Sequence, residues 1–280
     1  MTDRYLGKTA AFLTQHGKEH LIGPLFQEAL GCTLLRAEGY DTDLLGTFSG
    51  EIQRTESQLI TVRKKARIGM ELTGASQGIA SEGAFVPDPF GGLMPWNIEM
   101  LVWLDDENQL EIVGMAQGPA RNVQRVVGSI SELEAFAREA GFPQHHIMLR
   151  PQAETDTRIR KGLSDWHALQ QAFTDCLHES KNQLVYTEND LRAFCNPTRQ
   201  SIIRRAAEDL IKKIHSACPA CSMPGFAVYA HHAGLPCRAC GEATQLAQSY
   251  LWCCAVCQHK AQTPSLEAHA DPSRCDRCNP

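Results

Sequence analysis

Eight of the twelve cysteines fall into four C-x-x-C pairs near the C-terminal end of the chain. Two thiolates three positions apart on a tight turn can hold one tetrahedral metal ion, and two such pairs complete a Cys₄ site. An all-sulfur shell suits zinc and leaves no open position for a substrate, so this spacing predicts structural metal binding rather than catalysis. The predicted ligands are Cys218, Cys221, Cys237, Cys240, Cys254, Cys257, Cys275 and Cys278.

Four pairs predict two zinc ions, and the spacing leaves open which pairs share an ion. Sequential pairing puts the first and second pairs on one ion and the third and fourth on the other, whereas a cross-brace alternates them. We favour sequential pairing, because the spacing of the first two pairs suits a zinc ribbon. Cys253 adjoins Cys254 and could replace it. An iron–sulfur cluster also uses four cysteines and remains an alternative.

The cysteine-rich segment, residues 217–280, is short and poor in large aliphatic residues. It therefore cannot fold around a core of its own, and metal binding would supply the missing free energy. Gly241 follows the second pair and suits the positive φ of a ribbon turn. The isolated Cys32, Cys176 and Cys195 are expected to be small buried hydrophobic residues.

The rest of the chain alternates β and α patterns, which indicates an α/β domain with a mixed sheet. We expect an α/β domain over residues 1–150, an α/β extension ending in a long helix over 151–216, and the zinc-ribbon module over 217–280. The predicted strands lie near 10–13, 33–35, 78–80, 99–104, 110–117, 146–149 and 183–187, and the predicted helices near 18–30, 58–72, 131–140, 164–178 and 197–215.

Composition narrows the class of protein. Hydrophobic residues make up 43% and charged residues 21%, which is typical of a globular domain. The net charge of −5 argues against a dominant nucleic-acid footprint. No apolar run resembles a signal peptide or approaches the ~20 residues that span a bilayer, so we expect no membrane partner and a cytoplasmic location.

The turn from Thr14 through His16 to Lys18 joins an expected strand to an expected helix. A small polar turn with a lysine at a helix start suits an anion, because backbone N–H groups and the helix dipole both favour negative charge there. The alternative is an ordinary helix start capped by Thr14.

Two carboxylates and a lysine form a second candidate group. Glu51 lies in a polar loop, Glu82 follows a buried strand, and Lys65 lies on the helix between them. Carboxylates at loop and strand ends can hold Mg²⁺ that retains waters for a phosphate, and a lysine would neutralise phosphate charge. The alternative is that Lys65 belongs to a solvated face and Glu51 is a surface residue.

A third group joins a strand to the last long helix. Asp190, Arg192, Asn196 and Arg199 supply an acid, two arginines and a helix cap, and could close over a phosphate or a carboxylate. The alternative is that Asp190 pairs with Arg192 or Arg199 and only fixes the loop.

These segments, taken in order with the four C-x-x-C pairs, resemble a family of bacterial proteins classed as a domain of unknown function. The resemblance covers nearly the whole chain but carries no settled activity. Its segments are Thr14–Glu19, Leu45–Phe48, Gly78–Gly83, Pro95–Asn97, Asn196–Arg199 and the end of the chain at Cys275–Pro280.

The N-terminal part is also similar in order to the inosine/xanthosine triphosphate pyrophosphatase superfamily, which includes Maf-like proteins. Those enzymes open with a strand, a Thr/Ser-x-Asn-x-x-Lys turn and a helix. Here Thr14 and Lys18 match approximately, but His16 stands where Asn is expected and the turn is one residue shorter. Their later helix carries Asn-Ala-x-x-Lys-Ala, of which this chain keeps Lys65 and loses the Asn.

That resemblance implies a mixed-sheet fold of the inosine triphosphate pyrophosphatase type and metal-assisted hydrolysis of a nucleoside triphosphate. Mg²⁺ held by Glu51 and Glu82 would position water, and Lys18 and Lys65 would hold the phosphates.

Two classes of function therefore compete. One is a Mg²⁺-dependent hydrolase of nucleoside triphosphates or a related phosphate ester, with structural zinc in its C-terminal module. The other is a non-enzymatic binding module whose zinc ribbons recognise nucleic acid or a protein partner. The balanced charges of residues 217–280 give nucleic-acid binding only weak support.

Overall fold

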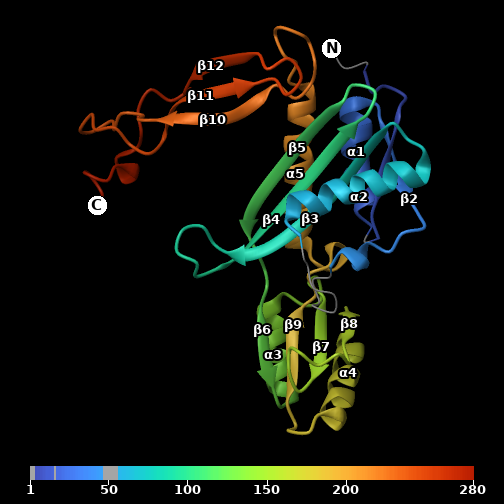
Figure 1. Cartoon of the computed structure of the whole chain (residues 1–280). Coiled ribbons are helices and arrows are strands. Elements are labelled where there is room, and N and C mark those ends of the chain that lie inside the picture. The colour runs from blue at the N-terminus through green and yellow to red at the C-terminus, as the bar shows by residue number, and fades with distance from the viewer. Residues whose placement is uncertain (1–3, 16, 47–55) are drawn as a thin grey trace.

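The computed structural model of the chain describes residues 4–15, 17–46 and 56–280. Its largest sheet is mixed and has five strands in the order β2-β1-β3-β4-β5 (Figure 1). β1 lies between β2 and β3 and is parallel to both, whereas β3, β4 and β5 form antiparallel pairs. The strands are β1 (Thr9–Leu13), β2 (Thr33–Ala37), β3 (Gln77–Pro87), β4 (Pro95–Asp105) and β5 (Leu110–Pro119).

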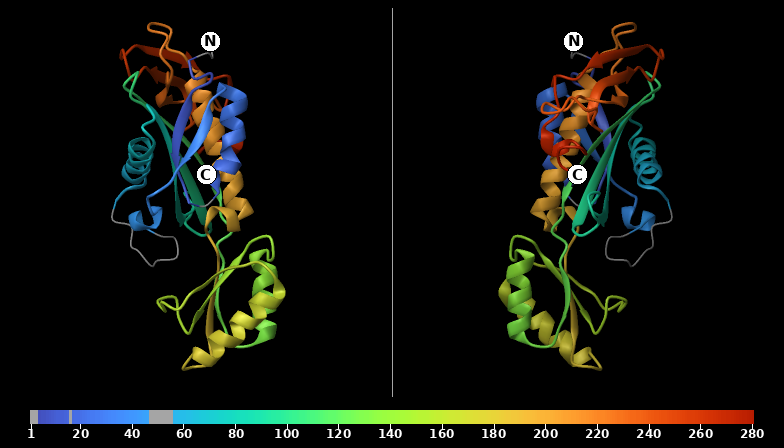
Figure 2. Two further views of the ribbon diagram at one scale, coloured as in Figure 1. Left: turned by 90° about the vertical axis from the view of Figure 1, so that its right-hand side faces the viewer. Right: turned by 90° about the vertical axis from the view of Figure 1, so that its left-hand side faces the viewer.

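Helices cover both faces of this sheet, as the side views in Figure 2 show. α2 (Gln58–Thr73) packs on one face, and α1 (Lys18–Leu30) and α5 (Pro197–His215) pack on the other. Gly114 of β5 lets α5 approach closely, because a Cβ at this position would lie 2.4 Å from the Cβ of Leu210. Sheet and helices together form the body of the molecule.

A second sheet is inserted between β5 and α5. It is antiparallel, with the order β6-β9-β7-β8, and both of its helices pack on one face around a core of their own. Its elements are β6 (Gln124–Val127), α3 (Ile130–Ala140), β7 (Ile147–Pro151), β8 (Arg160–Leu163), α4 (Trp166–Glu179) and β9 (Val185–Asn189). We call residues 124–189 the inserted module; the boundary expected between residues 150 and 151 falls inside β7.

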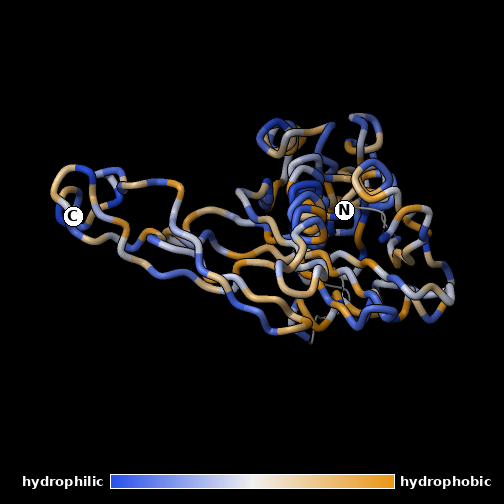
Figure 3. Tube along the Cα trace, turned by 90° about the horizontal axis from the view of Figure 1, so that it is seen from above, coloured by the Kyte–Doolittle hydropathy of each residue, from blue (hydrophilic) through white to orange (hydrophobic). Residues whose placement is uncertain are grey.

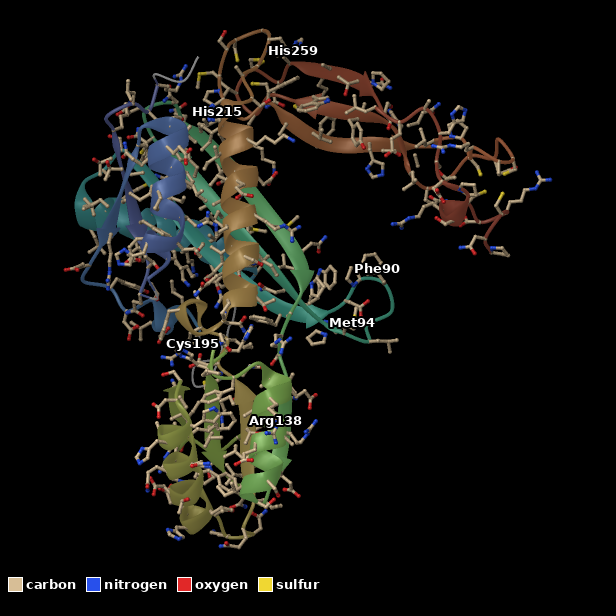
Figure 4. The ribbon with its side chains drawn as sticks, turned by 180° about the vertical axis from the view of Figure 1, so that it is seen from behind. Phe90, Met94, Arg138, Cys195, His215 and His259 are labelled. Atoms are coloured by element: carbon tan, nitrogen blue, oxygen red, sulfur yellow. The ribbon has the colours of Figure 1, made fainter. Side chains whose placement is uncertain are left out.

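The C-terminal segment forms an arm that extends away from the body (Figures 1 and 3). Its antiparallel sheet has the order β10-β11-β12, and most of its residues are exposed or half-buried. At its base the Phe226 ring stacks on Trp252, and His215 and His259 lie at the junction with α5 (Figure 4). The strands are β10 (Ala227–Ala233), β11 (Ala247–Cys253) and β12 (Lys260–Pro264).

Two side chains of α5 bind the backbone of β5. The Lys213 ammonium donates to the carbonyl oxygen of Val113, and the backbone N–H of Met115 donates to the Asp209 carboxylate. Lys213 and Asp209 also form an ion pair of 2.7 Å. The end of α5 is thus fixed to the middle of β5 before the chain enters the arm.

The loop between β3 and β4 projects from the body (Figure 4). The Asp88 carboxylate accepts backbone N–H groups from Phe90, Gly91 and Met94, which lowers the pKa of that carboxyl. These bonds order a loop whose Phe90 side chain is exposed.

All five predicted helices are present, and each begins and ends within two residues of its predicted bounds. Side chains and glycines mark these ends as expected: Asn196 caps α5, and Gly31 in the left-handed region ends α1. Among the described residues, no helix is both long and apolar enough to cross a membrane.

Candidate metal centres and a buried charge cluster

The eight predicted cysteine ligands gather into two Cys₄ groups. Within each group the four sulfur atoms lie within 4.8 Å of one another. The closest Sγ–Sγ distances are 3.6 Å, for Cys218 to Cys257 and for Cys240 to Cys275. Four sulfurs around zinc at about 2.3 Å would stand about 3.8 Å apart, so the residues fit a tetrahedral ion.

The pairs alternate, so our prediction of sequential pairing is wrong. One group joins the first and third pairs at the base of the arm, and the other joins the second and fourth pairs at its tip. The reason is the antiparallel pairing of β10 with β11. It brings the pair before β10 beside the pair after β11, an arrangement that local spacing does not reveal.

The turns carrying these cysteines have the expected backbone. Gly241, directly after the second pair, has φ of 74°, and Ser222 and Gln258 hold positive φ after the first and third pairs. Cys254 is the ligand of the base group, whereas the Cys253 thiol points to the carbonyl oxygen of Cys254 and to Gln258.

The pKa values of the cysteines in the tip group also favour the binding of a cation. The backbone N–H of Cys240 is the largest cause that lowers the pKa of Cys237, to about 7. The neighbouring Cys240 sulfur raises the pKa of Cys278 to about 12. Four thiolates at these distances repel one another, so all four ionise together only around a metal ion.

A second group of candidate functional side chains lies in the body, near the end of β1. β1 pairs with β3 as far as Phe12 opposite Ile79, and β3 then continues past it. The side chains around this point carry five buried charges, which we call the charge cluster. Its members are Lys18, Lys65, Glu82, Glu99 and Arg199.

Two ion pairs hold most of this charge. The Lys65 ammonium lies 2.6 Å from the Glu82 carboxylate, and the Arg199 guanidinium lies 2.7 Å from Glu99. All four side chains are nearly inaccessible to solvent. Burying such pairs costs desolvation free energy that only good geometry offsets, so a cluster of them is expensive to maintain.

Lys18 is the fifth charge, and its Nζ lies 2.9 Å from the hydroxyl oxygen of Ser81. Burial is the main cause that lowers its pKa to about 7; the nearby Arg199 and Lys65 act in the same direction, and Glu99 and Glu82 oppose them. A lysine in this state gains most from an arriving anion, because negative charge restores its ordinary protonation.

The residues of the third predicted group, which run from the end of β9 into the first turn of α5, have two different roles. Asp190 is fully buried and pairs with Arg192 within the loop, as the alternative interpretation has it. Arg199 instead pairs with Glu99 across 100 residues and donates to the carbonyl oxygen of Leu191. Asn196 accepts the backbone N–H of Arg199, which places the arginine at the start of α5.

The remaining predicted residues are placed as follows. Thr14 is buried directly after β1. His16 and Glu51 lie outside the described residues. The structure thus brings Lys18, Lys65, Glu82 and Arg199 together and leaves Asp190 and Arg192 paired with each other.

Sequence reasoning missed Glu99 and Ser81. A signal for Glu99 was present, because it is a carboxylate in a strand that is otherwise strongly apolar. Ser81 carried no such signal, since serine is common in strands and at their ends.

A cavity of about 270 Å³ opens beside the cluster. Gly17 and Lys18 form one wall at the start of α1. The opposite wall comes from α5 and from the short 3₁₀ helix at Ala193–Cys195. The other lining residues are His20, Leu21, Ala193, Phe194 and Gln200.

Fold and site together define a mixed α/β protein that carries a cysteine-based arm able to hold two metal ions. The sequence profile of a family described as a domain of unknown function, DUF6671, matches residues 65–280, and the chain belongs to that family. The matched region contains all eight clustered cysteines and, from the charge cluster, Lys65, Glu82, Glu99 and Arg199. No curated protein matches the chain.

Proposed function

We propose that the charge cluster binds the phosphate groups of a small molecule, and that the chain hydrolyses a nucleoside triphosphate or a related phosphate ester with Mg²⁺. The two Cys₄ groups hold structural zinc in this proposal. The observation that carries it is the meeting of Lys18, Lys65 and Arg199 with two carboxylates at the carboxyl end of β1, beside a cavity.

The charge balance of the cluster favours an anion. Three cationic side chains face two carboxylates, so the cluster has one positive charge in excess when Lys18 is protonated. A phosphate group would compensate that excess inside a site of low dielectric constant, where the interaction is stronger than in water.

The carboxylates supply the metal chemistry. Glu82 follows the part of β3 that pairs with β1, and would hold Mg²⁺ together with Glu51. Bound there, the ion would neutralise phosphate charge and position an attacking group. Lys65, which pairs with Glu82, would turn toward the phosphates when the metal takes the carboxylate.

The order of elements supports the same proposal. A strand, a turn, a helix that begins at Lys18, a second strand, a helix with Lys65 and a strand with Glu82 follow one another in the chain, an order similar to that of the inosine triphosphate pyrophosphatase type of fold. We include that fold type in the proposal, with Thr14, His16, Asp190 and Arg192 as further substrate-binding candidates.

A metal count followed by a substrate screen tests this function. We expect about two zinc ions per chain, since each Cys₄ group holds one. We expect phosphate or pyrophosphate release from at least one member of a panel of standard and modified nucleoside triphosphates with Mg²⁺. Glu82→Gln should abolish the release, whereas Glu71→Gln on the exposed face of α2 should leave it unchanged.

Because Glu82→Gln leaves Lys65 buried without its charged partner, the double variant Glu82→Gln, Lys65→Met removes the pair together. A folded double variant that keeps full release would contradict the role of the cluster. A panel that yields no release with zinc-loaded protein would contradict the hydrolase itself.

One observation favours the alternative of a binding module. The arm presents both faces of a thin sheet to solvent, and Tyr229 on β10 is 54% exposed. Each zinc with four thiolates would carry two negative charges, so a protein partner suits the arm better than nucleic acid. A shift of DNA or RNA mobility that disappears with salt would reverse that preference.

A further inference from the structure

We propose that Ser81 is the nucleophile of this site and that Lys18 is its general base. The substrate class, a phosphate ester, rests on the function proposed above, but the reactivity of Ser81 does not depend on it. Ser81 lies beside the charge cluster, in contact with Lys18, and is not itself a charged member of it.

The two side chains are positioned for proton transfer. Lys18 opens α1, Ser81 lies on β3 just past the last pair with β1, and Nζ and Oγ are 2.9 Å apart. Only 3% of Ser81 and 7% of Lys18 are exposed. When Lys18 is protonated it donates to Oγ, and when it is neutral its lone pair can accept the Ser81 proton over the same distance.

The surroundings make a neutral lysine available near pH 7. Arg199 from α5 and Lys65 from α2 disfavour a charge on Lys18, whereas Glu99 from β4 and Glu82 from β3 favour it. Desolvation exceeds each of them and places the pKa of Lys18 at about 7. An exposed lysine would remain protonated at this pH and could not act as a base.

The cavity reaches the Lys18 member of this pair, whereas Ser81 is not among its lining residues. Lys18 and Gly17 form part of its wall, so a group inside it meets the lysine first. Gly17 is left-handed, and no side chain among the described residues caps the start of α1. Backbone N–H groups at the start of this first turn can therefore stabilise negative charge on a group bound in the cavity.

The reaction would then run in two balanced steps. Ser81 Oγ attacks phosphorus, an Oγ–P bond forms and the bond from phosphorus to the leaving oxygen breaks. The proton passes from Oγ to Lys18 Nζ and then to the leaving oxygen. In the second step water attacks the phosphoserine, its proton passes through Nζ to Oγ, and phosphate or the phosphorylated fragment leaves.

Two other described serines, Ser249 and Ser201, lack this combination. Ser249 is also buried, but its hydroxyl accepts a hydrogen bond from the Gln262 amide rather than from a lysine. Ser201 is exposed on α5 and donates to the carbonyl oxygen of Thr198. Ser249 is therefore the control for a buried serine, and Ser201 is the control for an accessible serine.

A fluorophosphonate probe tests the pair without a known substrate. Oγ of an activated serine displaces fluoride from the probe, and the proton goes to the base. We expect one adduct, located on Ser81 by peptide mass spectrometry, whose rate of formation rises as pH passes through about 7. Ser81→Ala should remove the adduct, and Ser249→Ala and Ser201→Ala should not.

The variants Lys18→Met and Lys18→Arg test whether Lys18 acts as a general base or only makes a structural contact with Ser81. Arginine keeps the positive charge and the hydrogen-bond donor but cannot accept a proton at these pH values. We expect both variants to slow adduct formation on the order of 10²-fold or more, with circular dichroism confirming that they are folded. Labelling that is unchanged in folded Lys18→Met, or absent from Ser81 in the unsubstituted protein, would overturn the proposal.

Turnover distinguishes this inference from the proposed function. Phosphate release that depends on Glu82 but survives Ser81→Ala would overturn the serine nucleophile and leave the hydrolase standing. Labelling of Ser81 with no release from any nucleotide would overturn the hydrolase and keep the Ser81–Lys18 pair. Loss of release in Ser81→Ala, with a phosphorylated Ser81 trapped by acid quench, supports both.

Discussion

The body buries Trp103, Phe12 and Phe26 with many aliphatic side chains, whereas the arm buries little besides Phe226 and its own cysteines. A sheet with two mostly exposed faces cannot offset the conformational entropy lost on folding. We therefore expect the arm, unlike the body, to need metal ions at its two Cys₄ groups in order to fold. The body can instead bear the cost of five buried charges at one end of β1.

The largest expected effect comes from breaking a Cys₄ group. A structural zinc contributes about 10–16 kcal/mol of apparent binding free energy. Cys237→Ser and Cys275→Ser should each lower the zinc content from about two to about one and unfold the tip of the arm. Hydrogen exchange should show that the base of the arm and the body keep their protection.

The control for this experiment is Cys253→Ser, which removes a thiol outside both groups and should change neither zinc content nor exchange. Sequential sharing of ions by the C-x-x-C pairs would give a different pattern of hydrogen exchange. Cys237→Ser would then expose the residues around Cys218 and leave those around Cys275 protected, contrary to the observed groups.

A smaller effect is expected from breaking a buried ion pair in the body. Arg199→Met leaves the Glu99 carboxylate buried without its cation, which should lower the free energy of unfolding by about 3–5 kcal/mol. The double variant Arg199→Met, Glu99→Gln should lose less, since no charge is left alone. Urea unfolding measures both, and the exposed Arg205→Met serves as the control.

The smallest effect concerns the pH dependence of the body. The folded pKa of Lys18 is about 7, below its ordinary value near 10.5, so between these values the unfolded chain binds more protons. Stability should therefore rise with pH across this window, on the order of 2 kcal/mol from pH 7 to 9. Below pH 7 the cost of the buried charge is fully present.

Lys18→Met should flatten that rise, and the exposed Lys212→Met should not. Urea unfolding at the two pH values measures the difference. An equal rise in the protein with and without Lys18 would mean that another group carries the dependence.

The comparison of the two regions also explains what the sequence could predict. The helices of the body were predictable, because caps and glycines such as Ser57 and Gly74 mark their ends and apolar residues repeat at helical spacing. β6 and β8 were missed, since each has only four residues and neither alternates clearly between buried and exposed positions. The strands of the arm show no sustained alternation of buried and exposed residues, because neither face of their sheet packs on a large core.

The candidate sites, too, were predictable from the sequence only in part. C-x-x-C spacing identified all eight cysteines of the two Cys₄ groups, but which pairs share a group depends on strand pairing that spacing does not encode. The order of elements indicated Lys18, Lys65 and Glu82. Arg199 and Glu99 are 100 positions apart in the chain, and their ion pair follows only from the packing of α5 on β4.

The contacts of Lys213 and Asp209 with β5 have a further consequence. β5 is the last strand of its sheet, and its outward N–H and C=O groups could otherwise recruit a strand from another molecule. The lysine and the aspartate occupy such groups at Val113 and Met115. The helix that leads into the arm thereby hinders edge-to-edge pairing at this part of β5, whether or not the arm holds metal.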